Sequence, residues 1–487
     1  MSKRLLRMLT MQLHRMLAMV MIGVLGHISA APLNGAVNHP LNGWYPCKEF
    51  TFSNGVSSSG QGEDAECAIY TAPFCYPGIC EVSEFAEPTA DIFAKRIPAT
   101  AGDTKTAHNV WLLQGGPGYS FTAIRSDMVE LRTKLGGAVN VYTMDYRGTG
   151  RSTLFDCVAA QITTTGSTWG RAIDPSEVPT SAKDLRMNYG TVVVERLMHL
   201  NPPTVNGYFL DGIATTSEAS VNNFKYYSEW DVDCGEVGEH FMELFAQDSS
   251  CSSHFQSTNL SVTLHDMMMK IDNDPNSTCA KVLSNSTDTP PSFVLRTTFS
   301  VLLKDAAMRT FIPAVVYRLN RCNSNDVDVL NRFFTWMNAY SSFSSQDDSF
   351  QSTLLYYLII FSDMWETPSP STFEMESHFT NAAKSPACDE LNLSNYEGEG
   401  IIHQRDQYWN KSAVVSTQAS VLLLSGKLDP QTPHKYAEYL LDALDCPKKE
   451  IVTFDYATHG TIVSTTFVTY ERSHQLLTDH LRSHIRY

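Results

Sequence analysis

Short apolar runs stand at both ends of the chain, and a long polar middle separates them. This arrangement limits the possible folds more than any other feature. The runs are nearly continuous in apolar residues, which is typical of parallel strands that helices bury on both faces. They occupy residues 92–97, 110–113, 139–144, 207–210, 421–424 and 451–454. Helix-like stretches alternate with them, so the sequence predicts an α/β core with a mostly parallel sheet flanked by helices.

The middle of the chain has a different character. It is rich in Ser, Asn, Asp and aromatic residues, and helix-length patterns occur at 264–271 and 293–317. A mainly helical cap inserted into one α/β core is the simplest arrangement. We therefore expect a signal peptide at 1–30, the first part of the core with a Cys-rich entry segment at 31–213, the cap at 214–412 and the rest of the core at 413–487.

The first thirty residues have the pattern of a secretory signal peptide. Basic residues come first, an apolar stretch follows at 16–26, and Ala30 offers a small residue for cleavage. The basic residues are Lys3, Arg4, Arg7 and Arg15. The stretch is shorter than the ~20 residues that span a bilayer, which disfavours an uncleaved anchor; a buried core helix is the other alternative. The pattern predicts a secreted, extracellular protein with no membrane association after cleavage.

Cysteines and glycosylation motifs agree with that compartment. The 11 cysteines lack the paired spacings of zinc sites, so we expect disulfides, no metal site and no cofactor. Four of them fall between residues 47 and 80, which predicts an N-terminal segment of the core that is cross-linked by disulfides. The odd total leaves one cysteine without an internal partner. Acceptor motifs for N-glycans occur at Asn259, Asn276, Asn285, Asn392 and Asn410.

Charge argues against a nucleic-acid partner. Lys and Arg number 36 against 52 Asp and Glu, which gives a formal net charge of -16. A polyanion would meet a repulsive field, and no basic run interleaved with aromatic residues is present.

Two glycine-rich turns follow predicted strands. Gln114-Gly115-Gly116-Pro-Gly118 comes directly after the run at 110–113. Glycine has no Cβ, so backbone N–H groups there can face a ligand oxygen, although an ordinary strand-to-helix turn is an alternative. The second turn, Asp145-Tyr-Arg-Gly-Thr-Gly-Arg-Ser152, follows the run at 139–144. It lies about one strand–helix unit further along the chain.

Together these turns resemble those of the prolyl-aminopeptidase and tripeptidyl-aminopeptidase branch of the α/β-hydrolases. That family carries HGGPG after its third strand and D-x-R-G-x-G-x-S after its fourth, and Gln114 stands here in place of the usual His. The resemblance implies the α/β-hydrolase fold and a peptide substrate. It also implies a serine peptidase that removes residues from peptide N-termini through an acyl-enzyme.

The C-terminal part extends the resemblance to a catalytic acid and base. Asp429 follows the strand-like run at 421–424, and His459 follows the run at 451–454. Adjacent parallel strands would set both side chains at the same carboxyl edge of the sheet. There an acid orients the imidazole and the imidazole acts as general base. Taken alone, Asp429 could instead cap a helix and His459 could be a surface residue.

The nucleophile of such an enzyme is not found. No G-x-S-x-G motif occurs in the chain. Where the family reads G-x-S-Y-G-T, this chain has Arg186-Met-Asn188-Tyr189-Gly-Thr, so Asn188 takes the position of the Ser. An amide cannot act as nucleophile. Residues 153–186 also lack a strand-like apolar run, so we expect the central nucleophile strand to be missing.

The resemblance assigns the oxyanion hole to backbone N–H groups of Gly115, Gly116 and Tyr189. Three functional readings stay open at this point. The first is a secreted serine aminopeptidase-like hydrolase, inactive in this chain because of Asn188. The second is a non-catalytic secreted protein that binds peptides. In the third, a skipped exon, an intron error or a deletion has removed the strand and the Ser from an active enzyme.

Overall fold

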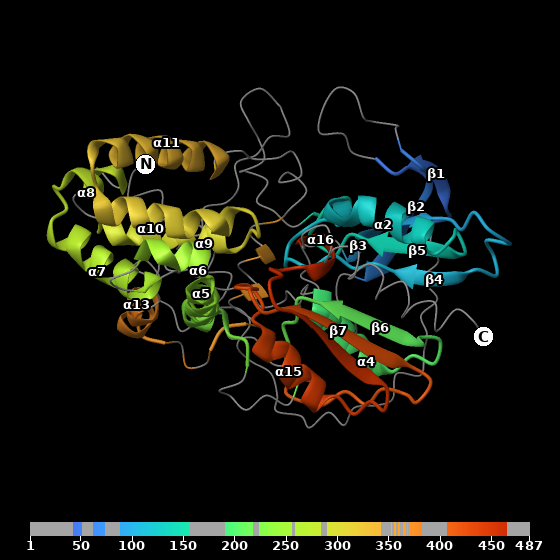
Figure 1. Ribbon diagram of the computed structural model, residues 1–487. Coiled ribbons are helices and arrows are strands. Elements are labelled where there is room, and N and C mark those ends of the chain that lie inside the picture. Colours follow the sequence, from blue (N-terminus) through green and yellow to red (C-terminus); the bar gives the residue numbers. More distant parts are fainter. Residues whose placement is uncertain are drawn as a thin grey trace, which may run out of the picture. The chain divides into compact units, whose positions relative to one another are not determined.

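The computed structural model describes the larger part of the chain (Figure 1). The described residues are 42–50, 62–73, 88–154, 190–217, 224–255, 259–283, 290–341, 352, 355–356, 359–360, 364–366, 368, 370–381 and 407–464. Several sequence predictions lie outside them: the signal peptide, Asn188, Tyr189 and the glycosylation motifs at Asn285 and Asn392.

The first sheet has five strands in the order β1-β2-β3-β5-β4. The strands are β1 (Tyr45–Lys48), β2 (Asp64–Pro73), β3 (Thr89–Ile97), β4 (His108–Trp111) and β5 (Val139–Met144). Helix α2 (Arg125–Lys134) packs Met128 and Leu131 onto this sheet. A disulfide between Cys47 and Cys67 joins β1 to β2, while Cys75 and Cys80 are outside the described residues.

One strand direction differs from the sequence prediction. The apolar run at 92–97 predicts a parallel strand, but β3 pairs antiparallel with both β2 and β5. Only β4 and β5 run parallel among the described strands of this sheet. The reason is that a continuous apolar run reports burial on both faces, and an interior antiparallel strand can be buried in the same way.

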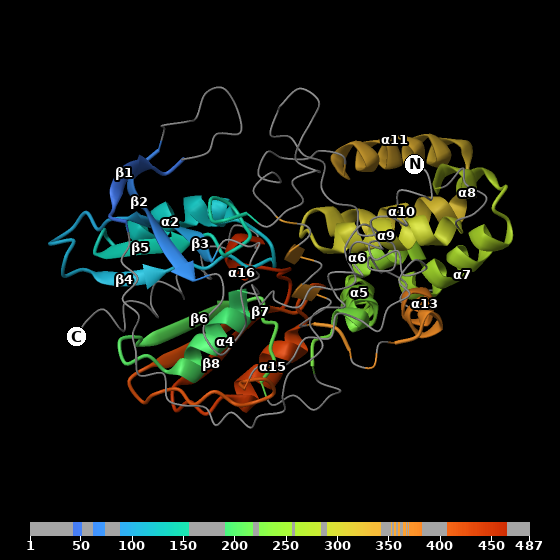
Figure 2. The ribbon, with the colours of Figure 1, turned by 180° about the vertical axis from the view of Figure 1, so that it is seen from behind.

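The second sheet consists of three parallel strands in the order β6-β7-β8. They are β6 (Gly207–Asp211), β7 (Ser420–Gly426) and β8 (Lys449–Phe454), and they confirm the predicted strands at 207–210, 421–424 and 451–454. Helices α4 (Gly190–Leu200) and α15 (His434–Ala443) cover one face, where Met198 and Leu440 join the buried side chains of β6 and β7. Figure 2 shows α4 lying against these strands.

Each of the two sheets ends, among the described residues, in a strand with a partner on one side only. β4 is the last strand of the first sheet and β6 the first of the second, and within the described residues neither has a further partner strand. Phe209 of β6 nevertheless packs against the apolar clusters of both sheets. The described strands and helices form an α/β-hydrolase fold. The expectation that its central strand is missing concerns residues 153–186, most of which lie outside the described residues.

The described part of the chain between β6 and β7, here called the inserted segment or insertion, is mainly helical. Its helices are α5 (Trp230–Gln247), α6 (Ser249–Ser252), α7 (Leu260–Asn273), α8 (Thr278–Leu283), α9 (Pro291–Leu303), α10 (Phe311–Arg321), α11 (Ser324–Ser341) and α13 (Thr372–Asn381). The pattern at 293–317 divides into two helices because the Asp305 side chain accepts N–H groups from Ala307 and Met308 and ends the first one. A second disulfide, Cys279–Cys322, joins α8 to the end of α10. No helix in the described ranges is long and apolar enough to cross a membrane.

The two ends of the inserted segment are tied together beside α4. The Asn410 N–H donates to the Thr216 carbonyl oxygen at 3.0 Å. The Thr216 N–H donates to Oε2 of the buried Glu195 on α4 at 3.2 Å. Burial raises the pKa of Glu195 to about 7, although the Thr215 hydroxyl and the Thr216 N–H oppose this. The place where the chain leaves the core and returns to it is therefore held by buried polar contacts.

The open edge of β4 leads to a prediction about self-association. Trp111 at the end of β4 is 52% exposed, and β4 has no second partner strand within the described ranges. A strand edge with an exposed apolar residue is a template for pairing with another chain. Trp111→Lys should weaken self-association about tenfold, as followed by light scattering over a concentration series. Phe373→Lys on α13 removes an even more exposed aromatic away from any strand edge. An equal effect of both variants would contradict the role of the edge.

Candidate active site

Asp429 lies in a tight turn that begins where β7 ends. Its carboxylate is buried, and Oδ1 accepts backbone N–H groups from Gln431 at 2.8 Å and Thr432 at 2.9 Å. Oδ2 accepts the Thr432 hydroxyl at 2.6 Å. Helix α15 begins beyond this turn with Pro433 as its N-cap residue, so Asp429 is not the helix cap. The carboxylate instead shapes the turn and leaves Oδ2 directed toward the neighbouring strand end.

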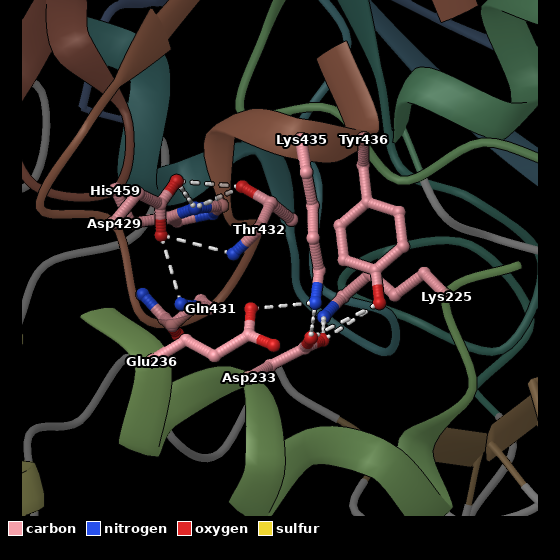
Figure 3. Close-up of polar contacts among 9 residues, drawn as sticks. All are labelled: Lys225, Asp233, Glu236, Asp429, Gln431, Thr432, Lys435, Tyr436 and His459. Atoms are coloured by element: carbon pink, nitrogen blue, oxygen red, sulfur yellow. Dashed lines mark hydrogen bonds and ion pairs between the residues drawn. The ribbon is translucent and has the colours of Figure 1, made fainter. Parts of the chain in front are cut away.

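His459 reaches Asp429 from the turn after β8. The ring atom Nδ1 lies 2.9 Å from Asp429 Oδ2 and 3.0 Å from Thr432 Oγ1 (Figure 3). β7 and β8 are parallel neighbours, and Gly426 at the end of one pairs with Phe454 at the end of the other. Two residues singled out in the sequence are thus brought into contact, with 37% of the His459 side chain exposed.

The environment favours the charged form of both groups. For Asp429, burial alone would raise the pKa, but His459 and the hydrogen bonds from Thr432 outweigh burial and hold the pKa below its usual range. For His459, burial favours the neutral ring, but the Asp429 carboxylate prevails and raises the pKa. An Nδ1–H directed at an ionised Asp429 leaves Nε2 as the basic ring nitrogen.

Asp211 and Gly212, at the end of β6, hold the His459 turn from the other side. Asp211 accepts N–H groups from Thr461 at 2.8 Å and Ile462 at 2.9 Å, at the start of the short helix α16 (Thr461–Ser464). Gly212 has φ +71°, and a Cβ there would lie 2.7 Å from His459 Cε1. Sequence reasoning missed both residues. The signal was there, because an acidic residue and a glycine directly follow a buried strand, as in the turn at Asp145.

The glycine-rich turn after β4 is contacted by the inserted segment. Ser352 N–H donates to the Gly118 carbonyl oxygen at 2.9 Å, and a Cβ at Gly118 would lie 2.6 Å from Ser352 O. Gly116, with φ +139°, precedes Pro117 through a cis peptide bond. Gly115 is partly exposed and Gly116 exposed. Their role as oxyanion donors stays a prediction, as does that of Tyr189.

Asp145 in the second turn is architectural. Its buried carboxylate accepts N–H groups from Phe121 and Arg151, both at 2.9 Å, and so ties the two glycine-rich segments together. Burial raises the pKa of Asp145 to about 6, although those two N–H groups oppose it. The Ser152 hydroxyl donates to the Asp145 carbonyl oxygen at 2.7 Å. The acid and the final Ser of this motif therefore hold the turn itself.

No metal centre is visible in the part of the chain that the structure describes, where no group of three or more His, Cys, Asp or Glu side chains could hold an ion. Every contact of the Asp429 carboxylate given above is a hydrogen bond to a nearby N–H or O–H group. The arrangement is that of a hydrogen-bonded acid–base pair, which suits proton transfer at Nε2 of His459.

No protein-family model matches the sequence, and no curated protein matches it. Several solved hydrolase structures are similar over most of the chain. An esterase from Exiguobacterium antarcticum is 13% identical, with 82% of this chain and 96% of the esterase covered and a TM-score of 0.30. A serine hydrolase from Cycloclasticus zankles has the same identity and coverage and a TM-score of 0.32. Epoxide hydrolase A from Mycobacterium thermoresistibile is 13% identical, with 81% and 95% covered and a TM-score of 0.30. Likeness at this level carries no argument about activity, and the fold class rests on the strand order and pairing.

Asp429→Asn tests the acid–base pair. The pKa of His459 is raised above 6.5 in the folded protein, so its charge stabilises the fold below about pH 6.5, and this contribution is lost as the pH rises through the folded pKa. Removing the carboxylate should lower the pKa of His459 and cost about 2 kcal/mol of stability near pH 6. Histidine NMR titration and denaturant unfolding at several pH values measure both. An unchanged His459 titration would contradict the pairing.

Gly212→Ala tests the space that β6 leaves for the imidazole. A Cβ should displace the His459 ring, shift its NMR signals and cost about 1–3 kcal/mol through overpacking. Gly102→Ala is a matched control because Gly102 has φ +78° and no atom lies within 4 Å of the position that its added methyl group would occupy. Both variants carry the cost of a positive φ, about 1 kcal/mol. If Gly102→Ala moved the His459 signals equally, backbone strain rather than contact would be the cause.

Proposed function

We propose that this chain is a secreted, aminopeptidase-like serine hydrolase that is inactive because Asn188 occupies the position of the nucleophile. The observation that carries the proposal is the Asp429–His459 hydrogen bond of 2.9 Å at adjoining strand ends, with Thr432 contacting both side chains. This is the acid–base half of a Ser-His-Asp arrangement, in the chain order of the α/β-hydrolases.

The Asp429–His459 pair alone is not sufficient for hydrolysis, because it needs a nucleophile to activate. An imidazole whose Nδ1–H faces a carboxylate can take a proton from a hydroxyl or thiol at Nε2. Asn188 offers only an amide, which yields neither a useful proton nor a nucleophilic oxygen. The expected loss of the nucleophile strand adds to this, because residues 153–186 lack a strand-like apolar run in the sequence.

The choice of a peptide substrate and of N-terminal cleavage follows the resemblance of the two glycine-rich turns to those of the aminopeptidases. The expected oxyanion donors Gly115 and Gly116 precede Gly118, whose carbonyl accepts from Ser352 of the inserted segment. An inserted segment next to these glycines is placed to select what approaches them. Peptide binding without turnover is the second candidate. It needs only an accessible site, and the His459 side chain, 37% exposed, can be reached by a bound polar group.

Secretion and glycosylation belong to the same proposal. The disulfides Cys47–Cys67 and Cys279–Cys322 suit an oxidising compartment. Three of the five acceptor residues are described, and all three are exposed: Asn259, Asn276 and Asn410. Asn259 caps α7 through its Oδ1, which accepts from the Val262 N–H. A glycan on Nδ2 would leave this cap in place.

A fluorophosphonate probe that labels activated serines tests the proposal. The purified chain should not be labelled above a heat-denatured control, because Asn188 stands where the family has its nucleophilic Ser. Asn188→Ser should restore little labelling, since the sequence before position 188 lacks the apolar run of a supporting strand. Labelling of the unaltered chain that is lost in His459→Ala would overturn the claim of inactivity. Near-complete activity of Asn188→Ser would refute the missing strand.

Sequencing the transcript across codons 185–190 tests whether a skipped exon, an intron error or a deletion has removed the Ser and its strand. A strand and a G-x-S-Y-G motif in the transcript would make this chain a defective version of an active peptidase. A transcript that encodes residues 185–190 as they stand here would show that this chain is the protein that the gene produces. Calorimetric titration with short peptides then separates the two remaining functions, because saturable binding without hydrolysis identifies a peptide-binding protein.

A further inference from the structure

The inserted segment contacts the start of α15 through a buried carboxylate on α5. Asp233 is 1% exposed and accepts the Tyr436 hydroxyl at 2.9 and 3.1 Å (Figure 3). Lys435 Nζ lies 2.7 Å from Asp233 Oδ1, and Lys225 Nζ lies 3.5 Å from Oδ2. Three polar groups from two separate segments therefore converge on one side chain: the Tyr436 hydroxyl and the Lys435 ammonium of α15, and the Lys225 ammonium, which forms an ion pair.

Lys435 and Tyr436 follow the Asp429 turn directly. Thr432, which donates both its N–H and its hydroxyl to Asp429, is followed by Pro433 and then by α15. Lys435 and Tyr436 lie in the first turn of that helix, and Tyr436 is buried. A force that fixes the start of α15 thereby fixes the turn that holds Asp429, because only two residues stand between Thr432 and Lys435.

The buried Lys225 ammonium makes the contact costly to break. Lys225 is 2% exposed and lies over the rings of Trp230 and Tyr436, with its ammonium 5.4 and 5.2 Å from their centres. Burial lowers the pKa of Lys225, while the nearby carboxylates of Asp233 and Asp429 oppose this. Without Asp233, a buried ammonium would lose its nearest opposite charge, which is far more destabilising than loss of a surface pair.

We propose that Asp233 is a positioning residue for the Asp429–His459 pair, acting through Lys435 and Tyr436 on the first turn of α15. The geometry of the pair then depends on the insertion being docked. This inference rests on the proposed function, which gives the pair its chemical role. It adds that the insertion helps to build the acid–base pair, beyond any contact with a substrate.

The same helix provides a matched control. Glu236 also lies on α5 and also binds Lys435, at 2.7 Å, but its side chain is 55% exposed. Exposed ion pairs contribute little because water and salt screen them. Glu236→Gln should therefore leave the turn at 429–432 unchanged, whereas Asp233→Asn should loosen it.

Hydrogen exchange and histidine NMR on the full chain test the proposal. In Asp233→Asn, the amides of Gln431 and Thr432, which donate to Asp429, should exchange at least about tenfold faster. The amides of β2 should keep their rates, and the His459 titration should move toward that of an unpaired histidine. Tyr436→Phe removes a single donor and should act in the same direction with a smaller effect, which keeps the test valid if Asp233→Asn does not fold.

Two outcomes would overturn the inference. One is unchanged exchange of Gln431 and Thr432 in both Asp233→Asn and Tyr436→Phe. The other is an equal effect of Glu236→Gln. Failure of the proposed function would look different, because His459 of the unaltered chain would then titrate at or below about 6.5 and would not respond to Asp429→Asn.

Discussion

The rest of the site depends on the hydrogen bonding of the buried Asp429 carboxylate. Two backbone N–H groups, one hydroxyl and one imidazole converge on it, from Gln431, Thr432 and His459. A buried carboxylate is costly unless such donors surround it. The turn after β7, the start of α15 and the orientation of His459 are therefore consequences of satisfying one charge.

A second constraint comes from what stands around that charge. Asp211 and Gly212 hold the His459 turn from β6, and Asp233 holds the start of α15 from the insertion. The acid–base pair is thus supported on both sides.

Sequence reasoning succeeded where a local pattern has a single structural meaning. The run at 139–144 became β5 with the same bounds, and the strands at 421–424 and 451–454 lie side by side and parallel. It failed where the pattern is degenerate. The apolar run at 92–97 could not reveal that β3 is antiparallel, because burial does not encode direction. The break at Asp305 depends on a side chain competing for backbone N–H groups, which an apolar period does not show.

The sequence by itself determined the α/β class, the two glycine-rich turns, the positions of Asp429 and His459 and the lack of a Ser at position 188. Each of these features depends on residues that are close together in the chain. Only the tertiary structure decided that Gly212 makes room for His459 and that Asp233 reaches α15 from about two hundred residues away. Contacts between distant segments depend on how the sheets and helices pack, and no local pattern carries that information.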